Sequence, residues 1–532
     1  ISDTAIDGEV ELTMGFNFPL IDALGLDDVD ISASADITSF RLEGVLDPLP
    51  IENGRMQIEV NNDRLEANGR VEMDDMPLEL RWREEFKPGP NEDPTRFNLS
   101  GQINLARFSQ AEAVVGLAGT TRVALSLAGK GFAISTGELT AELDTAALAL
   151  PMLDWSKPEG EPASFSARLG SGERGLQVRN FSMQAPDLDV RGTIDLGPRF
   201  GFREVRLSRA KIGQTDAELV LKKRSLGSYA LRVSGQRVHL APMLEGLLQS
   251  GGTEGPIGNL EMDIDLASAS LLEGVELRGI KGMARYVAGW LEEAHLGAAI
   301  GDEQEPLFLS ISRNGLVRDL FMATENAGAV TRGLGLFDGA RGGRVRMEAV
   351  INDRQSESPT LGIARIEGFR LAQAPGIARV LSLASLTGIG DMLSGQGLTF
   401  DRFQADFKLS GSTIALRNAR GSGSQIGISL AGTVDNGANQ VDLQGTLVPA
   451  YTLNTVLGYV PLIGDLLTGG PGGGLFAIGF SLSGPADNPN VSVDPLSALA
   501  PGFLRGMVNP FEEVRPDPQA MAEEAGLDVP LN

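Results

Sequence analysis

The sequence predicts a mostly β protein, in which a long antiparallel β-sheet of unequal hairpins curls into a trough. Three observations support this class. Apolar and polar residues alternate with a period of two in many segments, which is the signature of strands. Glycine makes up 67 of the 532 residues, nearly twice the usual share, as expected for many turns and short strands. Apolar residues at helical spacing occur only in a few short stretches, mainly near the C-terminus.

The alternation is clearest in three segments. Residues 29–37 place Val, Ile and Ala at odd positions with Asp or Ser between them, and residues 56–60 repeat the pattern. In residues 403–409, Phe, Ala, Phe and Leu alternate with Gln, Asp and Lys. Because a period of two puts alternate side chains on opposite faces, each strand has one apolar and one wet face, as antiparallel sheets allow.

A finer motif places glycine on the apolar side of a strand. Residues 65–71 read Leu, Ala, Gly and Val at alternate positions, and related patterns return at 97–103, 188–194, 428–434 and 441–447. The irregular intervals between these glycines argue against a fixed-period solenoid. Two interpretations are open: the glycines permit bulges and bends in a twisted sheet, or they make room for a ligand along the apolar face.

Loop sequences divide the chain. Stretches rich in Pro, Gly and polar residues lie at 87–91, 157–162, 250–256, 352–359 and 469–474. We expect a first part of the trough at 1–240 and a second part at 241–373, which opens with a short helix at 241–249. A C-terminal region with apolar helices follows at 374–510, and an acidic flexible tail at 511–532.

Three segments depart from the strand pattern. Residues 375–394 carry only Arg379 and Asp391 as charges, residues 452–467 have helical spacing, and residues 495–508 place seven apolar side chains on one stripe. These helices either cap the sheet or contact a membrane surface. The residues that would make membrane contact are Ile377, Leu381, Leu386, Leu496, Leu499, Phe503, Leu504 and Met507. No window of about 20 residues is apolar enough to cross a bilayer.

The residues that usually carry chemistry are scarce. The absence of cysteine excludes disulfides and thiolate catalysis, and His239 and His295 lack the spacing of metal ligands. The carboxylates at 27–30 and 74–75 do not match a calcium loop, and the basic run 222–224 is interpreted as a wet strand face. The net charge of −25 disfavours nucleic acid as a partner. We therefore expect no enzyme activity and no catalytic, cofactor-binding or metal-binding residues.

Ordered motifs in the C-terminal third carry a family resemblance. They are LGIARIEGFR at 361–370, APGIARVLS at 374–382, GLTFD at 397–401, PLIG at 461–464, GGLFAI at 473–478, GPADNP at 484–489 and VSVDPLSALAPG at 491–502. This series resembles the AsmA-like superfamily, in particular its YhdP branch. The strong motifs cover roughly 361–510. Residues 147–162 also resemble that branch, and a weaker similarity covers much of the rest of the chain.

The resemblance implies a long, curled β trough with an apolar lining. It implies a place in the periplasm of a Gram-negative cell envelope, with an inner-membrane anchor formed by an N-terminal helix outside this chain. The implied role is to move phospholipids between the inner and outer membranes and so support outer-membrane integrity. The implied partners are phospholipid acyl chains and the two membranes; envelope proteins are further candidates.

Elementary physics favours the same role. Each acyl CH₂ group in water costs about 0.8 kcal/mol, so a two-chain lipid faces a barrier on the order of 20 kcal/mol, which an apolar face removes without catalysis. About 30 strands at ~4.8 Å spacing would span on the order of 140 Å. Strand parity predicts the groove-lining residues: Leu188, Val190, Ile194, Phe403, Phe407, Leu409, Ile428, Leu430, Val441 and Leu443.

Two other classes of function stay open. An assembly factor could offer sheet edges to outer-membrane proteins by β-augmentation. A structural tether would have a filled core and carry no ligand. Lipid along the apolar face, polypeptide at an edge strand, or large side chains closing the trough would distinguish the three.

Overall fold

The structure is a computed structural model. It describes residues 5–21, 25, 28–43, 51–73, 75–90, 92–108, 116–172, 175–197, 202–225, 227–244, 258–288, 290–352, 359–372, 374–383, 397–449 and 478–494. These residues contain 30 strands and a few short helices, and every pairing with a defined register is antiparallel. The predicted fold class is therefore confirmed. The chain forms two compact units, 1–235 and 236–532.

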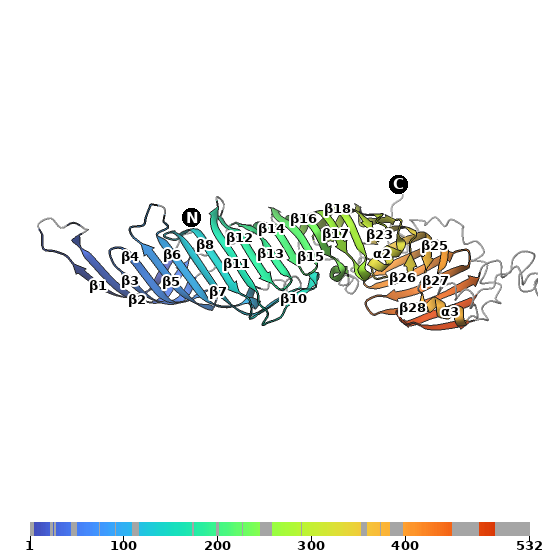
Figure 1. Ribbon diagram of the computed structural model, residues 1–532, viewed down its shortest axis with the longest axis horizontal. Helices are drawn as coiled ribbons and strands as arrows, with labels where there is room; N and C mark the ends of the chain where they lie inside the picture. The colour runs from blue at the N-terminus through green and yellow to red at the C-terminus, as the bar shows by residue number, and fades with distance from the viewer. Residues whose placement is uncertain are drawn as a thin grey trace, which may run out of the picture. The chain divides into compact units, whose positions relative to one another are not determined.

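Unit 1 is a sheet in which most strands pair with their neighbours in sequence (Figure 1). Its first strands are β1 Ala5–Asn17, β2 Asp30–Glu43, β3 Ile51–Val60, β4 Arg64–Met73, β5 Met76–Glu85, β6 Thr95–Asn104, β7 Gly116–Lys130 and β8 Ala133–Glu142. The sheet continues from β8 to β11 Ser164–Gly172, β12 Gly175–Ala185, β13 Leu188–Leu196, β14 Phe202–Ile212 and β15 Thr215–Ser225. The unit boundary falls inside β16 Ser228–His239, close to the expected division at 240.

A side hairpin branches from this sheet between β8 and β11. It consists of β9 Ala146–Leu150, the 3₁₀ turn Pro151–Leu153 and β10 Trp155–Lys157. Strand β9 pairs with the first residues of β7, while the rest of β7 pairs with β8. The hairpin is therefore not inserted between β8 and β11, which pair directly with each other. It can fold onto a face of the sheet.

The apolar face of unit 1 is buried although no second layer covers most of it among the described residues. Phe40, Leu42, Met56, Leu80 and Phe97, from β2, β3, β5 and β6, are each at most 2% exposed. A flat single-layered sheet would leave such side chains open to water. Their burial therefore requires the sheet to curl, so that side chains of neighbouring strands cover one another.

Unit 2 continues with strands that are neighbours in sequence (Figure 1). They are β17 Asn259–Ser270, β18 Glu276–Val287, β19 Trp290–Ile300, β20 Glu305–Asn314, β21 Val317–Thr324, β23 Arg344–Asn352 and β24 Thr360–Leu371. After them come β25 Leu398–Ser410, β26 Thr413–Ser422, β27 Ile426–Asp435, β28 Gln440–Pro449, β29 Ile478–Pro485 and β30 Asn490–Asp494. The pairing of β24 with β25 runs across the expected division at 373/374.

One neighbouring pair of strands runs parallel. Ser268 Oγ donates to Gln236 O at 2.9 Å, and Leu240 N donates to Ser270 O at 2.9 Å, so the contacts advance in the same direction along β16 and β17. A parallel connection requires a crossover, and the helix expected at 241–249 begins in it, at residues 241–244. Alternation of side chains carries no information on strand direction, so the sequence predicted only antiparallel pairs.

Two described helices pack on unit 2. Helix α2, Ala327–Gly333, begins at Asn326, whose side chain accepts a hydrogen bond from Ala329 N at 2.9 Å. It is buried beside the two-residue strand β22, Ala340–Arg341, and the 3₁₀ turn Leu272–Gly274. Helix α3, Pro375–Leu383, lies within the segment predicted to be helical. No helix in the described part of the chain is long and apolar enough to span a membrane.

Candidate functional site

The C-terminal strands of unit 2 present one continuous apolar face. The cross-strand register aligns Ile366, Phe403, Gly421, Ile428, Leu447 and Ile478 in one row from β24 to β29. A second row aligns Gly362, Phe407, Leu416, Gly432, Leu443, Leu482 and Val491. All of the lining residues expected here lie on this face and are half-buried: Phe403, Phe407, Leu409, Ile428, Leu430, Val441 and Leu443.

The glycines on this face are covered by neighbouring side chains. A Cβ atom on Gly445 would meet Ser429 O and would lie 2.6 Å from Phe480 Cζ. A Cβ atom on Gly362 would lie 2.7 Å from Phe407 Cζ, and one on Gly101 in unit 1 would lie 2.7 Å from Leu78 Cδ2. Aromatic and leucine side chains thus lie across the glycines. At these positions the glycines serve close packing of a curled sheet and do not open room for a ligand.

Helix α3 lies on the same apolar face. Val380 and Leu381 are fully buried in a cluster with Phe369, Phe400, Leu447 and Leu482, while Leu383 on the other side of the helix is 61% exposed. The expected membrane contact of Leu381 is therefore wrong, because this side chain is a core residue. Ile377 is half-buried and packs against the same cluster. The other expected contact residues lie outside the described residues: Leu386, Leu496, Leu499, Phe503, Leu504 and Met507.

In unit 1 the side hairpin β9–β10 covers part of the apolar face. Leu188 is 4% exposed and shares a cluster with Trp155 of β10 and Ile212 of β14. Trp155 Nε1 donates to Pro186 O at 3.2 Å, which fastens the hairpin beside β13. The expectation that Leu188 lines an open groove is corrected, because it is buried in this core. Val190 packs at the margin of the cluster, and Ile194, farther along β13, is half-buried.

The hairpin is held from inside by a buried lysine. Lys157 is 1% exposed, and its Nζ donates to Ala146 O at 2.7 Å and to Pro158 O at 3.0 Å. These carbonyl oxygens compensate the cost of burying the ammonium group. Because one of them belongs to β9, Lys157 ties the two strands of the hairpin together.

Register shifts keep the apolar face continuous where the sequence pattern changes phase. In β14, Val205 and Leu207 pair with β13 at odd positions, whereas Ala210 and Ile212 pair with it at even positions. Strand β14 has one extra residue between Leu207 and Ala210. All four apolar side chains can therefore lie on the same face. A strict period of two places Ala210 and Ile212 on the wet face, so parity counting missed them.

Strand β1 carries an exposed apolar edge that the sequence analysis did not single out. Val10, Leu12, Met14 and Phe16 are 51–56% exposed. In the antiparallel pairing of β1 with β2, they lie opposite Ile37, Ala35, Ala33 and Ile31 of β2. Among the described residues, β1 pairs with no other strand. The alternation VELTMGF at 10–16 was the available signal.

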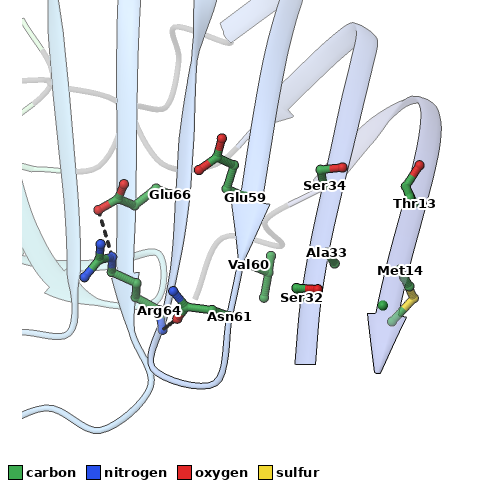
Figure 2. Close-up of a pocket in the computed structure, with 11 residues that line it drawn as sticks. Thr13, Met14, Ser32, Ala33, Ser34, Glu59, Val60, Asn61, Arg64 and Glu66 are labelled. Atoms are coloured by element: carbon green, nitrogen blue, oxygen red, sulfur yellow. Dashed lines mark hydrogen bonds and ion pairs between the residues drawn. The ribbon is translucent and has the colours of Figure 1, made fainter. Parts of the chain in front are cut away.

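A hollow on the polar face of β1–β4 has a different character (Figure 2). It has a volume of about 470 Å³, and its lining includes Thr13, Ser32, Ser34, Glu59 and Glu66. The carboxylate of Glu66 forms ion pairs with Arg64 at 3.0 Å and with Arg83 at 2.9 Å. Polar and charged side chains dominate this lining, so it does not suit an acyl chain.

The polar face of β13–β15 is organised by ion pairs. Arg206 and Lys222 pair with Glu204 at 2.6 and 3.4 Å, and Arg191 and Arg209 each pair with Asp189 at 2.8 Å. Burial raises the pKa of Glu204, but the hydrogen bonds from Arg206 and Lys222 outweigh it, and the pKa is lowered overall. Lys222 thus lies on a wet strand face, as expected.

The histidines occupy separate positions in unit 2. His239 Nδ1 lies 2.8 Å from Ser270 Oγ, and His295 Nδ1 lies 3.0 Å from Ser310 Oγ. His295 Nε2 is also 3.4 Å from Glu293, whose pKa is lowered chiefly by the hydrogen bond from Arg285. Within the described ranges, no three acidic or histidine side chains are grouped so that they could hold a metal ion.

Comparison with known proteins adds no relative: no family model, no curated protein and no solved structure matches this chain.

Proposed function

We propose that this chain is a lipid conduit in which phospholipid acyl chains move along the apolar face of a curled β-sheet. One observation carries the proposal: the apolar residues of one face align across successive strands β24–β30, and Phe403, Phe407, Ile428, Leu430, Val441 and Leu443 among them are only half-buried. Unit 1 has a face of the same kind on β13–β15, formed by Ile194, Val205 and Leu221.

Part of each apolar face is buried in a core cluster, and the rest carries half-buried side chains. This division supports the proposal. The clusters around Leu381 and Leu188 supply the buried core that a single-layered sheet needs for stability. Outside them, half-buried side chains retain apolar surface that an acyl chain could cover. At about 25 cal/mol per Å² of apolar area, such contact offsets much of the cost of taking a chain out of the bilayer.

The setting that we propose follows the family resemblance. The chain would lie in the periplasm of a Gram-negative envelope, held at the inner membrane by an N-terminal helix outside this sequence. It would carry phospholipids between the inner and outer membranes without enzymatic chemistry. The polar face would keep the sheet in water, since its arginines and lysines pair with the more numerous carboxylates.

The test places a charge on the half-buried face of β15. Leu219 faces the apolar side opposite Leu207, and Val220 points to the other face opposite Arg206. Leu219→Asp should reduce extraction of a fluorescent phospholipid from vesicles at least tenfold, because an acyl chain cannot cover a carboxylate without a large desolvation cost. Val220→Asp is the matched control and should extract lipid like the unmodified chain. Failure of the unmodified chain to extract lipid, or equal loss in both variants, would reject the conduit.

The exposed edge of β1 favours a second candidate, β-augmentation. An edge strand with four apolar side chains more than half exposed is a template for another strand. Leu12→Pro would remove one backbone donor from this edge. If the chain acts as an assembly factor, this variant should lose its effect on outer-membrane proteins while it still extracts lipid. For a pure conduit, neither readout should change.

A further inference from the structure

Two basic residues lie at one end of β14 and β15 in unit 1, next to the apolar residues of these strands. Val205 pairs with Leu221 on the apolar face, and Arg203 and Lys223 lie two residues beyond them along β14 and β15. A register shift opposite Asp195 and Leu196 gives β14 an extra residue at this position, Arg203. At this end of both strands, a basic residue thus lies beyond each member of the apolar pair.

These two residues differ from the basic residues on the wet face of the same strands. Arg206 and Lys222 share the carboxylate of Glu204, and Arg209 pairs with Asp189. In the described part of the chain, no ion pair joins Arg203 or Lys223 to an acidic residue. The charges on the wet face are therefore paired locally, whereas Arg203 and Lys223 have no acidic partner in the described part of the chain.

The guanidinium group of Arg203 also has an unmet hydrogen bond. Its Nη1 atom is buried and has no acceptor, although the side chain as a whole is only partly buried. A buried charged donor without a partner is costly, and such groups in folded proteins usually meet an acceptor. An arginine that is simply solvated at the margin of a sheet would keep this nitrogen in water.

We propose that Arg203 and Lys223 bind the phosphate group of a phospholipid whose acyl chains lie along Ile194, Val205 and Leu221. A phosphate offers several acceptor oxygens to the planar guanidinium and a negative charge to the ammonium group. The three apolar side chains are half-buried and adjoin one another across β13–β15, so head group and chains are recognised side by side. This inference depends on the proposed conduit and adds a point at which the head group is recognised.

The experiment compares lipids that differ only in the phosphate. The full chain is incubated with vesicles containing either phosphatidic acid or diacylglycerol of the same acyl composition, and the bound lipid is counted by native mass spectrometry. The test variant is Arg203→Gln with Lys223→Gln. The matched control, Arg206→Gln with Lys222→Gln, removes the same charges from the wet face. A separate titration with inorganic phosphate, followed by ³¹P NMR, tests for a site for the free ion.

The test pair should weaken binding of phosphatidic acid at least tenfold and leave diacylglycerol unchanged, while the control pair should change neither. Arg203→Lys, which keeps the charge, should retain part of the affinity and guards against a variant that fails to fold. Equal loss for both lipids, or no loss for phosphatidic acid, would overturn the phosphate site. So would inorganic phosphate binding as tightly as the lipid. If the unmodified chain binds neither lipid, the conduit itself fails.

Discussion

Arg379 of α3 donates a 2.6 Å hydrogen bond to Asn488 Oδ1, although 109 residues separate them in the chain. A second bond, from Arg379 Nη1 to Pro489 O at 2.9 Å, joins the same guanidinium to the turn between β29 and β30. The one charged residue of this helix therefore fastens it to the end of the sheet. The sequence offered Arg379 only as an interruption of an apolar segment.

Removal of this guanidinium should loosen α3. Arg379→Ala abolishes both hydrogen bonds, which should cost about 1–2 kcal/mol for a partly exposed pair. Amide hydrogen exchange in 377–383 should then speed up about fivefold to thirtyfold relative to the unmodified chain. Ser382→Ala, at an exposed position of the same helix, is the control and should leave exchange unchanged. Equal exchange in both variants would show that apolar packing alone holds α3.

Leu188 should behave as a core residue. Because it is 4% exposed beneath the side hairpin, Leu188→Ala should lower the free energy of unfolding by about 2–5 kcal/mol. Ile194→Ala in the same strand removes a half-buried side chain and should cost about 1 kcal/mol. Urea unfolding of both variants measures the difference. Similar losses would mean that the hairpin does not cover β13 as described.

The glycines of β27 and β28 should differ in their tolerance of alanine. Gly445→Ala places a methyl group against Ser429 O and Phe480, so it should destabilise unit 2 by about 1–3 kcal/mol. Gly427→Ala in the adjacent strand is the control, because its nearest neighbour would be 3.7 Å away. Its effect on stability should stay within about 0.5 kcal/mol. Thermal unfolding checks both, and a harmless Gly445→Ala would favour the ligand-space interpretation of these glycines.

Stability should fall in acid partly through Asp435. The pKa of Asp435 lies below its ordinary value of 3.8, because its carboxylate accepts hydrogen bonds first from the backbone of Ala438 and then from Ser412. A lowered pKa means stabilisation that is complete above the unfolded-state pKa and is lost as the pH falls through the folded-state pKa. When the pH falls from roughly 5 to roughly 2, a range that includes this ordinary value, the unmodified chain should lose free energy of unfolding. The Asp435→Asn variant should lose less of it over the same range. Identical urea midpoints across this range would exclude the contribution.

Sequence patterns predicted the face of a strand better than its depth or its direction. The alternation in 403–409 correctly put Phe403 and Phe407 on one side, because side-chain parity is a local property. Burial is not local: Leu381 and Leu383 are two residues apart, yet one is fully buried and the other 61% exposed, because only one faces the sheet. The bulge that re-phases β14 and the parallel pairing of β16 with β17 depend on neighbouring strands that parity cannot identify.

Helix α2 was also missed, for a physical reason that its residues make clear. Seven residues, AGAVTRG, are too few to establish a helical period, and two of them are glycine. The glycines are required by packing: a Cβ on Gly328 would lie 2.6 Å from Ala340 O, and one on Gly333 would lie 2.8 Å from Leu271 Cδ1. Tertiary contact therefore determined a helix that propensity disfavours.

The central claim is that lipid contacts one face of the sheet and avoids the other, and residue-by-residue photocrosslinking along β27 tests it most directly. Ile428 and Leu430 lie on the apolar face, while Ser429 and Ala431 lie on the opposite face of the same strand. With a photoreactive side chain at each position in turn, the purified chain is irradiated with radiolabelled phospholipid vesicles. Label is expected at 428 and 430, with little at 429 and 431. Equal label at all four positions, or label only at 429 and 431, would contradict it.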